Sequence, residues 1–242
     1  MLKLGYIFGT KDPRRLPIVI SPKSPFVKEK LTLINTFRRD RMPFMTPDEQ
    51  TWEDRYMNTP PEALPWNAGG PDSDLVRLVG NGRIPVGQAL DIGTGPGHDA
   101  VFLIEKGFNV IAIDISPSAI KLARENASRA GLFGFFQRGD IRRIPVEDGF
   151  IDFVNDRGCF HVLPPEDRAK AVSEIHRVLR RRGLFLLRVF SDKEADGPGP
   201  HRFTRPELEG IFSPQFHILD TWEGIFEGPL RPKSYSMLME KK

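Results

Sequence analysis

The part of the sequence best suited to hold a ligand is a short glycine-rich stretch, Asp91-Ile92-Gly93-Thr94-Gly95-Pro96-Gly97. Glycines at three alternate positions let the backbone turn sharply and approach a ligand closely, where any Cβ would collide. An apolar run, 88–92, precedes the stretch, and a helical pattern follows it to residue 106. The start of that helix presents free N–H groups and a positive dipole end, which suit a ligand carboxylate. The candidate binding residues of this loop are Asp91, Gly93, Thr94, Gly95 and Gly97.

A second candidate, Asp114, stands at the end of the next apolar run, 109–114. A carboxylate there can accept hydrogen bonds from both ribose hydroxyls of a nucleoside cofactor that lacks a 2′-phosphate, and Ile115 beside it can pack on the adenine. NAD is one such cofactor, but a dinucleotide motif requires glycine at its first, third and sixth positions. The sixth position here is His98, and the third glycine comes one residue earlier. The spacing therefore argues against an NAD-dependent oxidoreductase.

From about residue 51 to the C-terminus the chain resembles class I S-adenosylmethionine-dependent methyltransferases. In that family's pattern, Gly139-Asp140-Ile141 follows the third strand. The resemblance implies that Asp140 accepts a hydrogen bond from the adenine amino group and that Ile141 lines the ring. Further along, Asp156-Arg157-Gly158 resembles a segment of the thiopurine, tellurite-resistance and halide/thiol methyltransferases.

Two tryptophans upstream of the glycine loop, Trp52 and Trp66, also match that branch of the family. Trp52 and Tyr56 are spaced for one helix face, and Pro65-Trp66 follows them. This arrangement resembles the N-terminal element that folds over the cofactor in those enzymes. The resemblance thus implies that Trp52, Trp66 and Asp156 belong to the cofactor site. Ordinary core packing of the aromatic pair is the alternative.

Methyl transfer from a sulfonium is an in-line displacement by an unprotonated nucleophile that is held close and shielded from water. Arg157 and His161, which follow the fourth expected strand, are the candidate catalytic residues. We expect Arg157 to hold the cofactor carboxylate or an anionic acceptor bidentately, and His161 to accept a proton or orient the nucleophile. The structural alternatives are that Arg157 pairs with Asp156 or Asp152 and that His161 caps a loop.

Strand and helix patterns alternate along the chain and predict a doubly wound α/β fold. We expect a Rossmann-like sheet of about seven strands, mostly parallel with an antiparallel C-terminal strand, and helices on both faces. Residues 1–45 are expected to form an N-terminal arm, with Met42 or Met45 as an alternative translation start, and 46–242 the methyltransferase domain. The expected strands are 88–92, 109–114, 133–138, 151–155, 183–189, 216–222 and 234–239, and the main helices 72–79, 97–106, 117–130, 166–179 and 204–212.

The composition excludes several other classes of protein. No apolar run approaches the roughly 18 residues that a membrane span requires. The net charge is only +3, and the arginine pairs do not extend into a basic stripe, so we expect no nucleic-acid partner. The single cysteine, Cys159, rules out an internal disulfide framework and cannot anchor a cysteine-based metal site alone. We expect no metal and a cytoplasmic location.

The sequence therefore predicts an enzyme that uses S-adenosylmethionine to methylate a small-molecule nucleophile, first of all a thiol, a thiopurine or a related soft acceptor. One alternative keeps the cofactor and places the methyl group on an oxygen or nitrogen of a metabolite or macromolecule. Another is a non-catalytic nucleoside-binding protein of the same fold, which would bind the cofactor without turnover.

Overall fold

The computed structural model describes residues 6–8, 18–20 and 47–242, and the chain divides into two compact units, 1–41 and 42–242. In the first unit, strands β1 (Tyr6–Phe8) and β2 (Ile18–Ile20) pair in antiparallel fashion. The alternative starts Met42 and Met45 lie outside the described residues, and the domain boundary at residue 45 stays a prediction.

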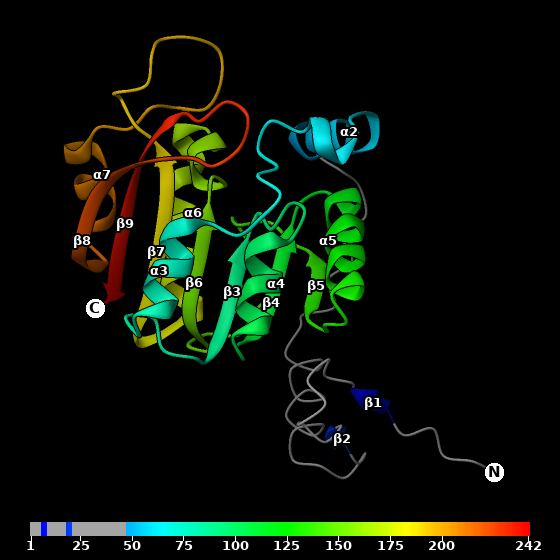
Figure 1. Ribbon diagram of the computed structural model, residues 1–242. Helices are drawn as coiled ribbons and strands as arrows, with labels where there is room; N and C mark the ends of the chain where they lie inside the picture. Colours follow the sequence, from blue (N-terminus) through cyan, green and yellow to red (C-terminus); the bar gives the residue numbers. More distant parts are fainter. Residues whose placement is uncertain (1–5, 9–17, 21–46) are drawn as a thin grey trace. The chain divides into compact units, whose positions relative to one another are not determined.

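The second unit contains a seven-stranded sheet in the order β5-β4-β3-β6-β7-β9-β8 (Figure 1). The neighbours from β5 to β7 are parallel, whereas β9 runs antiparallel to both β7 and β8. The predicted mixed sheet with an antiparallel C-terminal strand is thus confirmed. Its strands are β3 (Gln88–Ile92), β4 (Asn109–Asp114), β5 (Phe135–Arg138), β6 (Ile151–Arg157), β7 (Leu179–Phe190), β8 (Phe216–Ile225) and β9 (Lys233–Lys241).

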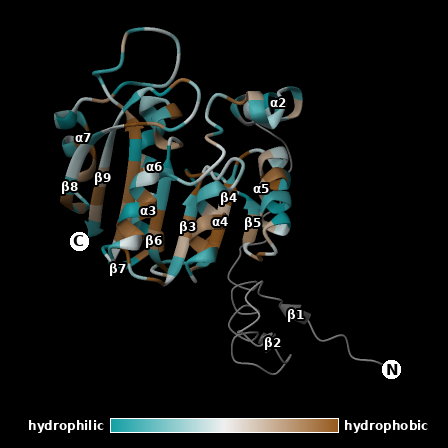
Figure 2. Cartoon of the chain, in the orientation of Figure 1, coloured by the Kyte–Doolittle hydropathy of each residue, from teal (hydrophilic) through white to brown (hydrophobic). Residues whose placement is uncertain are grey.

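Helices cover both faces of this sheet, and the alternation of side chains along β7 shows how. Leu186 belongs to the apolar cluster that includes Leu75 and Leu103 of two helices on one face. Its neighbour Phe185 points the other way and packs on Phe212, with ring centroids 5.9 Å apart. Figure 2 shows the apolar strands between these helices. The helices are α2 (Pro47–Asn58), α3 (Ser73–Gly80), α4 (His98–Glu105), α5 (Pro117–Arg129), α6 (Pro165–Val178) and α7 (Arg205–Phe212), with 3-10 turns η1 (Pro61–Ala63) and η2 (Phe160–Val162).

Local capping fixes where the helices begin beside the functional face. Asp72 accepts hydrogen bonds from the N–H groups of Asp74 and Leu75 at the start of α3. Ser116 likewise caps α5 by accepting from the N–H of Ala119 at 3.0 Å. The Ser116 cap sets the loop that follows β4 at the carboxyl edge of the sheet, where parallel α/β folds bind ligands.

Four strands, β6 to β9, are longer than their patterns predict, and β6 and β7 bear on the site. Strand β6 continues through Asp156 and Arg157, whose polar side chains favour a loop in the sequence, because their backbones pair with Leu187 and Arg188 of β7. Strand β7 begins at Leu179, before the expected start at Gly183. The two candidate residues of β6 therefore stand on a rigid strand end.

Candidate active site

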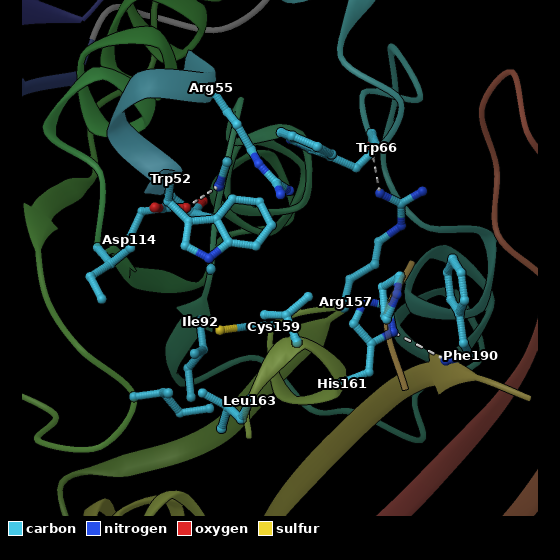
Figure 3. A pocket seen from close by; sticks show the side chains of 18 of the residues that line it. Trp52, Arg55, Trp66, Ile92, Asp114, Arg157, Cys159, His161, Leu163 and Phe190 are labelled. Atoms are coloured by element: carbon cyan, nitrogen blue, oxygen red, sulfur yellow. Dashed lines mark hydrogen bonds between the residues drawn. The ribbon is translucent and has the colours of Figure 1, made fainter. Parts of the chain in front are cut away.

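A cavity of about 1090 Å³ opens at the carboxyl ends of β3, β4 and β6. Figure 3 shows Trp52 and Asp114 on one side of it and His161 and Phe190 on the other. Twelve of the fourteen residues predicted for the site line this cavity, and Gly97 and Asp156 do not. The twelve are Trp52, Trp66, Asp91, Gly93, Thr94, Gly95, Asp114, Ile115, Asp140, Ile141, Arg157 and His161.

The glycine loop adopts the left-handed backbone that its composition predicts, with φ of 64° at Gly93, 50° at Gly95 and 81° at Gly97. A Cβ on Gly93 would lie 2.6 Å from the Cβ of Cys159, and one on Gly95 would lie 2.8 Å from the hydroxyl of Tyr56. At Gly97 the clash would be with Ala123 of α5 instead, at 2.8 Å. The first two glycines therefore shape the cavity, whereas the third lets α4 and α5 approach each other.

Asp91 holds the glycine loop in place through hydrogen bonds. Its carboxylate accepts hydrogen bonds from the hydroxyl of Thr94 at 2.6 Å and from the side-chain amide of Asn155 at 2.8 Å. Burial raises the pKa of Asp91 to about 6, despite these two donors. Both oxygens thus fix the loop through Thr94 and Asn155, and each keeps a further lone pair where Asp91 lines the cavity.

Asp114 lies buried at the end of β4, with one oxygen turned to the loop and the other to the next helix. It accepts from the N–H of Gly95 and from the N–H of Ser116, each at 2.9 Å. Each carboxylate oxygen has a further lone pair, so two ligand hydroxyls can still donate to it. Burial raises the pKa of Asp114 to about 6. Ile115 follows it along the cavity wall.

Asp140 is held by a neighbouring arginine that the sequence patterns did not indicate as part of the site. The Nε of Arg142 donates to both oxygens of Asp140 at 2.9 Å, and the backbone N–H of Arg142 donates at 2.8 Å. Arg142 reaches on to Asp167 at 2.8 Å and so ties the loop to α6. The buried side chain of Ile141 lies beside this pair on the cavity wall.

Helix α2 covers the cavity with aromatic rings, as the family pattern implies. Trp66 makes edge contacts with Trp52 and Tyr56 at centroid distances of 5.5 and 5.7 Å, and its indole N–H donates to the Tyr56 hydroxyl at 2.9 Å. Sequence reasoning missed the residue that docks this helix, Glu53. Its carboxylate accepts from the hydroxyls of Ser116 and Ser118 at 2.5 and 2.6 Å.

Asp156 lies outside the cavity, and this corrects the role that the resemblance implies for it. Its carboxylate accepts from the N–H of Cys159 at 2.8 Å and from the N–H of Phe160 at 3.0 and 3.2 Å. Burial raises its pKa to about 7. Asp156 therefore holds the turn η2 in place under the cavity, and its side chain does not face a ligand there.

Arg157 faces the cavity, but its partners are Asp72 and Glu227, not the Asp156 or Asp152 that the sequence offers as alternatives. Its Nε donates to Asp72 at 3.2 Å, and its two terminal nitrogens donate to the backbone of Trp66 and to the backbone and side chain of Glu227 at 3.2–3.5 Å. These contacts use four of the five N–H donors of a guanidinium. The expected bidentate grip on a ligand is therefore not available in this arrangement.

His161 is buried between Phe190 and Phe226, at centroid distances of 4.8 and 5.7 Å. Its Nδ1 accepts a hydrogen bond from the backbone N–H of Phe190 at 3.1 Å (Figure 3). Burial lowers the pKa of His161 to about 3, so the ring is neutral near pH 7. Since Nδ1 is an acceptor, Nε2 carries the proton. This geometry suits a hydrogen-bond donor and not the proton acceptor that the sequence also predicted.

Three comparisons connect this site to known proteins. A family model for a methyltransferase domain matches residues 89–183. A 2-heptyl-1-hydroxyquinolin-4(1H)-one methyltransferase from Mycobacteroides abscessus is 32% identical over 180 residues, which cover 71% of this chain and 78% of that protein. Thiocyanate methyltransferase 1 from Brassica oleracea is 27% identical over 169 residues, which cover 69% of this chain and 71% of that protein.

Solved structures share the fold. TehB from Haemophilus influenzae superposes with a TM-score of 0.61 at 20% identity, covering 80% of this chain and 67% of that one. A structure described as "Conversion of a Disulfide Bond into a Thioacetal Group during Echinomycin Biosynthesis" reaches 0.72 at 22% identity, covering 81% and 93%. Within the described residues, no helix is long and apolar enough to cross a membrane. The chain thus belongs to the methyltransferase family, as a class I enzyme with a Rossmann-like fold that takes S-adenosylmethionine as its methyl donor.

Proposed function

We propose that this enzyme methylates an acidic heteroatom of a small, flat and largely apolar molecule, with a thiol or thiopurine-like compound as the first candidate. The observation that carries the proposal is the environment of His161. The rings of Phe190 and Phe226 enclose it, and we call this part of the cavity the acceptor half. Such walls favour planar apolar ligands.

Three ionisable side chains near the acceptor half are poor proton acceptors at neutral pH. The ring of His161 is neutral and already a hydrogen-bond acceptor at Nδ1. Burial raises the pKa of Cys159 well above its usual value. Although burial opposes the change, hydrogen bonds from Ser73 and the charge of Arg188 lower the pKa of Glu227 to about 2. We therefore expect the acceptor to ionise without help from these three groups.

Thiols meet that condition, since a thiol with a pKa of about 8.5 is roughly a tenth ionised near pH 7.5. The guanidinium of Arg157 lies at the cavity wall, where its remaining N–H can donate a hydrogen bond to an anionic acceptor. His161 can donate its Nε2–H to the acceptor and so orient it. Together these groups bind and align an anionic nucleophile and leave proton removal to the solvent.

The other half of the cavity fits the cofactor. S-adenosylmethionine, when bound, supplies an electrophilic methyl group on a sulfonium. The backbone of the glycine loop would face its amino-acid end, and Asp114 would accept from its ribose. Asp140, Ile115 and Ile141 would surround the adenine, and the rings of Trp52 and Trp66 would cover the cofactor from solvent.

A second candidate acceptor is an acidic hydroxyl on an aromatic heterocycle, favoured by the 32% identity to the hydroxyquinolinone methyltransferase. This acceptor shares with a thiopurine a flat ring and a heteroatom that ionises readily. Both candidates are therefore consistent with the aromatic walls of the acceptor half and with an acceptor that ionises readily by itself.

Transfer of a deuterated methyl group from labelled S-adenosylmethionine, detected by mass spectrometry, tests the proposal. The panel pairs an arenethiol with the matching phenol, a thiopurine with its oxo-purine, and an N-hydroxyquinolone with the unhydroxylated ring. We expect methylation of the more acidic member of each pair, with rates that fall as the acceptor pKa rises. Methylation of unactivated alcohols or amines alone would contradict the proposal, and cofactor binding without any transfer would favour the non-catalytic alternative.

A further inference from the structure

The loop between β8 and β9, residues 226–232, forms one wall of the acceptor half. Phe226 and Pro232 line the cavity, and the ring of Phe226 packs on Phe190 and His161 at 5.4 and 5.7 Å. The loop closes on itself, since the N–H of Phe226 donates to the carbonyl of Pro232 at 2.9 Å. The position of this loop as a unit therefore decides whether the acceptor half has a complete wall.

Glu227 connects the loop to three other elements through one carboxylate. Its Oε2 accepts from Arg188 in β7 at 2.9 Å and from Arg157 at the end of β6 at 3.4 Å. Its Oε1 accepts from the N–H of Ser73, the first residue of α3, at 3.2 Å and also from the Ser73 hydroxyl. The side chain thus turns inward from the loop and reaches the charged groups beneath the cavity.

Glu227 brings a carboxylate from the loop to these charged groups. Arg188, whose side chain is only 5% exposed, pairs with Asp72 and with Asp74, and Arg157 pairs with Asp72 as well. Arg77 also pairs with Asp74, so three guanidiniums share two aspartates before Glu227 is added. The Glu227 carboxylate supplies a third negative charge and, through it, attaches the loop to Arg157 and Arg188.

The contacts that attach Glu227 to the arginines can break at a small cost in free energy. The Glu227 side chain is 31% exposed, and ion pairs that reach solvent contribute little net free energy. The ring of Phe226, next in the chain, lies over both guanidiniums, with its centroid 5.4 Å from Arg188 and 5.7 Å from Arg157. Release of Glu227 would therefore move Phe226 away from the same two arginines and open the wall.

We propose that Glu227 is a positioning residue for methyl transfer, which fixes Phe226 against the acceptor by holding the 226–232 loop on Arg157 and Arg188. The inference rests on the proposed function, because it takes the aromatic cluster as the place where the acceptor binds. The carboxylate of Glu227 is engaged by Ser73, Arg157 and Arg188, so we expect its effect to fall on how tightly the acceptor is held.

The test compares Glu227→Ala and Glu227→Gln with a matched control, Glu223→Gln. Glu223 is an exposed carboxylate on β8 that pairs with Lys193, away from the cavity. We expect Glu227→Ala to raise the acceptor KM by about fivefold or more while kcat and the Kd for S-adenosylhomocysteine stay within about twofold. The acceptor KM of Glu227→Gln should lie between those of the wild type and Glu227→Ala, and the KM of Glu223→Gln should match that of the wild type. Amide hydrogen exchange in the 226–232 peptide should quicken only in the Glu227 variants.

An unchanged acceptor KM together with unchanged exchange in Glu227→Ala would overturn the inference. So would a proportional loss of acceptor binding, cofactor binding and melting temperature, because that pattern marks a purely structural residue. If the wild type methylates no acceptor in the panel, the proposed function fails. Hydrogen exchange would still show whether Glu227 holds the loop, so the two failures are distinguishable.

Discussion

Replacing Asp114 with asparagine removes a negative charge from the end of β4 with little change in size. The carboxylate already accepts from two backbone N–H groups, and we assign its remaining lone pairs to the ribose hydroxyls of the cofactor. Hydrogen bonds to a charged group contribute about 1.5–3 kcal/mol each. Loss of one such bond weakens binding roughly 10- to 150-fold, since about 1.4 kcal/mol corresponds to a factor of ten.

The pH dependence of binding gives the same prediction a second readout. Burial raises the pKa of Asp114 to about 6, and ribose hydroxyls donate to the ionised form. Below pH 6 the proton must leave before the cofactor binds, so this group raises the apparent Kd about tenfold per pH unit. Above pH 6 the ionisation of Asp114 has no further effect on the apparent Kd. Asp91 also titrates near pH 6, so only the difference between wild type and Asp114→Asn isolates Asp114.

Calorimetric titration with S-adenosylhomocysteine at pH 8, 7, 6 and 5 measures both quantities. We expect the ratio of the variant Kd to the wild-type Kd to be largest at pH 8 and to be about tenfold smaller at pH 5. Asp152→Asn is the matched control, because Asp152 pairs with Arg180 and does not line the cavity. Equal affinity of Asp114→Asn and wild type at pH 8, or a ratio that ignores pH, would remove Asp114 from the cofactor site.

Three further substitutions separate cofactor contacts from structural ones. Gly95→Ala should weaken S-adenosylhomocysteine binding at least about tenfold, because its Cβ would lie 2.8 Å from the Tyr56 hydroxyl, whereas Gly70→Ala meets no atom within 4 Å and should bind normally in calorimetry. Glu53→Ala should release α2 and so weaken the same binding, with faster amide exchange across 47–58; unchanged exchange would contradict this role. Asp156→Ala should lower the free energy of unfolding in urea by about 1–3 kcal/mol, because the buried N–H groups of Cys159 and Phe160 lose their acceptor. The Kd for S-adenosylhomocysteine should stay unchanged. A variant of normal stability that no longer binds S-adenosylhomocysteine would show instead that Asp156 belongs to the cofactor site.

The sheet could be predicted from sequence because its strands carry strong local signals. The predicted strands 88–92 and 109–114 coincide with β3 and β4, since both faces of the parallel sheet are buried there. Gly93 follows the first strand, and Ser116-Pro117 opens the helix soon after the second. The end of β6 carried no such signal. Asp156 and Arg157 are polar residues in a strand, and only pairing with β7 extends the strand through them.

The cofactor half of the site was predictable for the same reason, whereas the contacts that hold its cover and its acceptor wall were not. The glycine loop and Asp114 follow strands directly, so the topology brings them together. Glu53 hydrogen-bonds Ser116, which lies 63 residues away in sequence, and Glu227 hydrogen-bonds Arg157, which lies 70 residues away. Neither glutamate differs in type or spacing from its acidic neighbours in sequence, so only tertiary packing selects them.

Charged residues of opposite sign lie in the two halves of the cavity. Carboxylates with raised pKa values, Asp91 and Asp114, stand in the half that we assign to the cofactor, and Arg157 stands toward the acceptor. A buried carboxylate is costly to ionise unless a cation is near. S-adenosylmethionine brings a positive sulfonium into that half, and its demethylated product has a neutral sulfur. We therefore expect these carboxylates to favour the methyl donor over the product, which would promote exchange after each turnover.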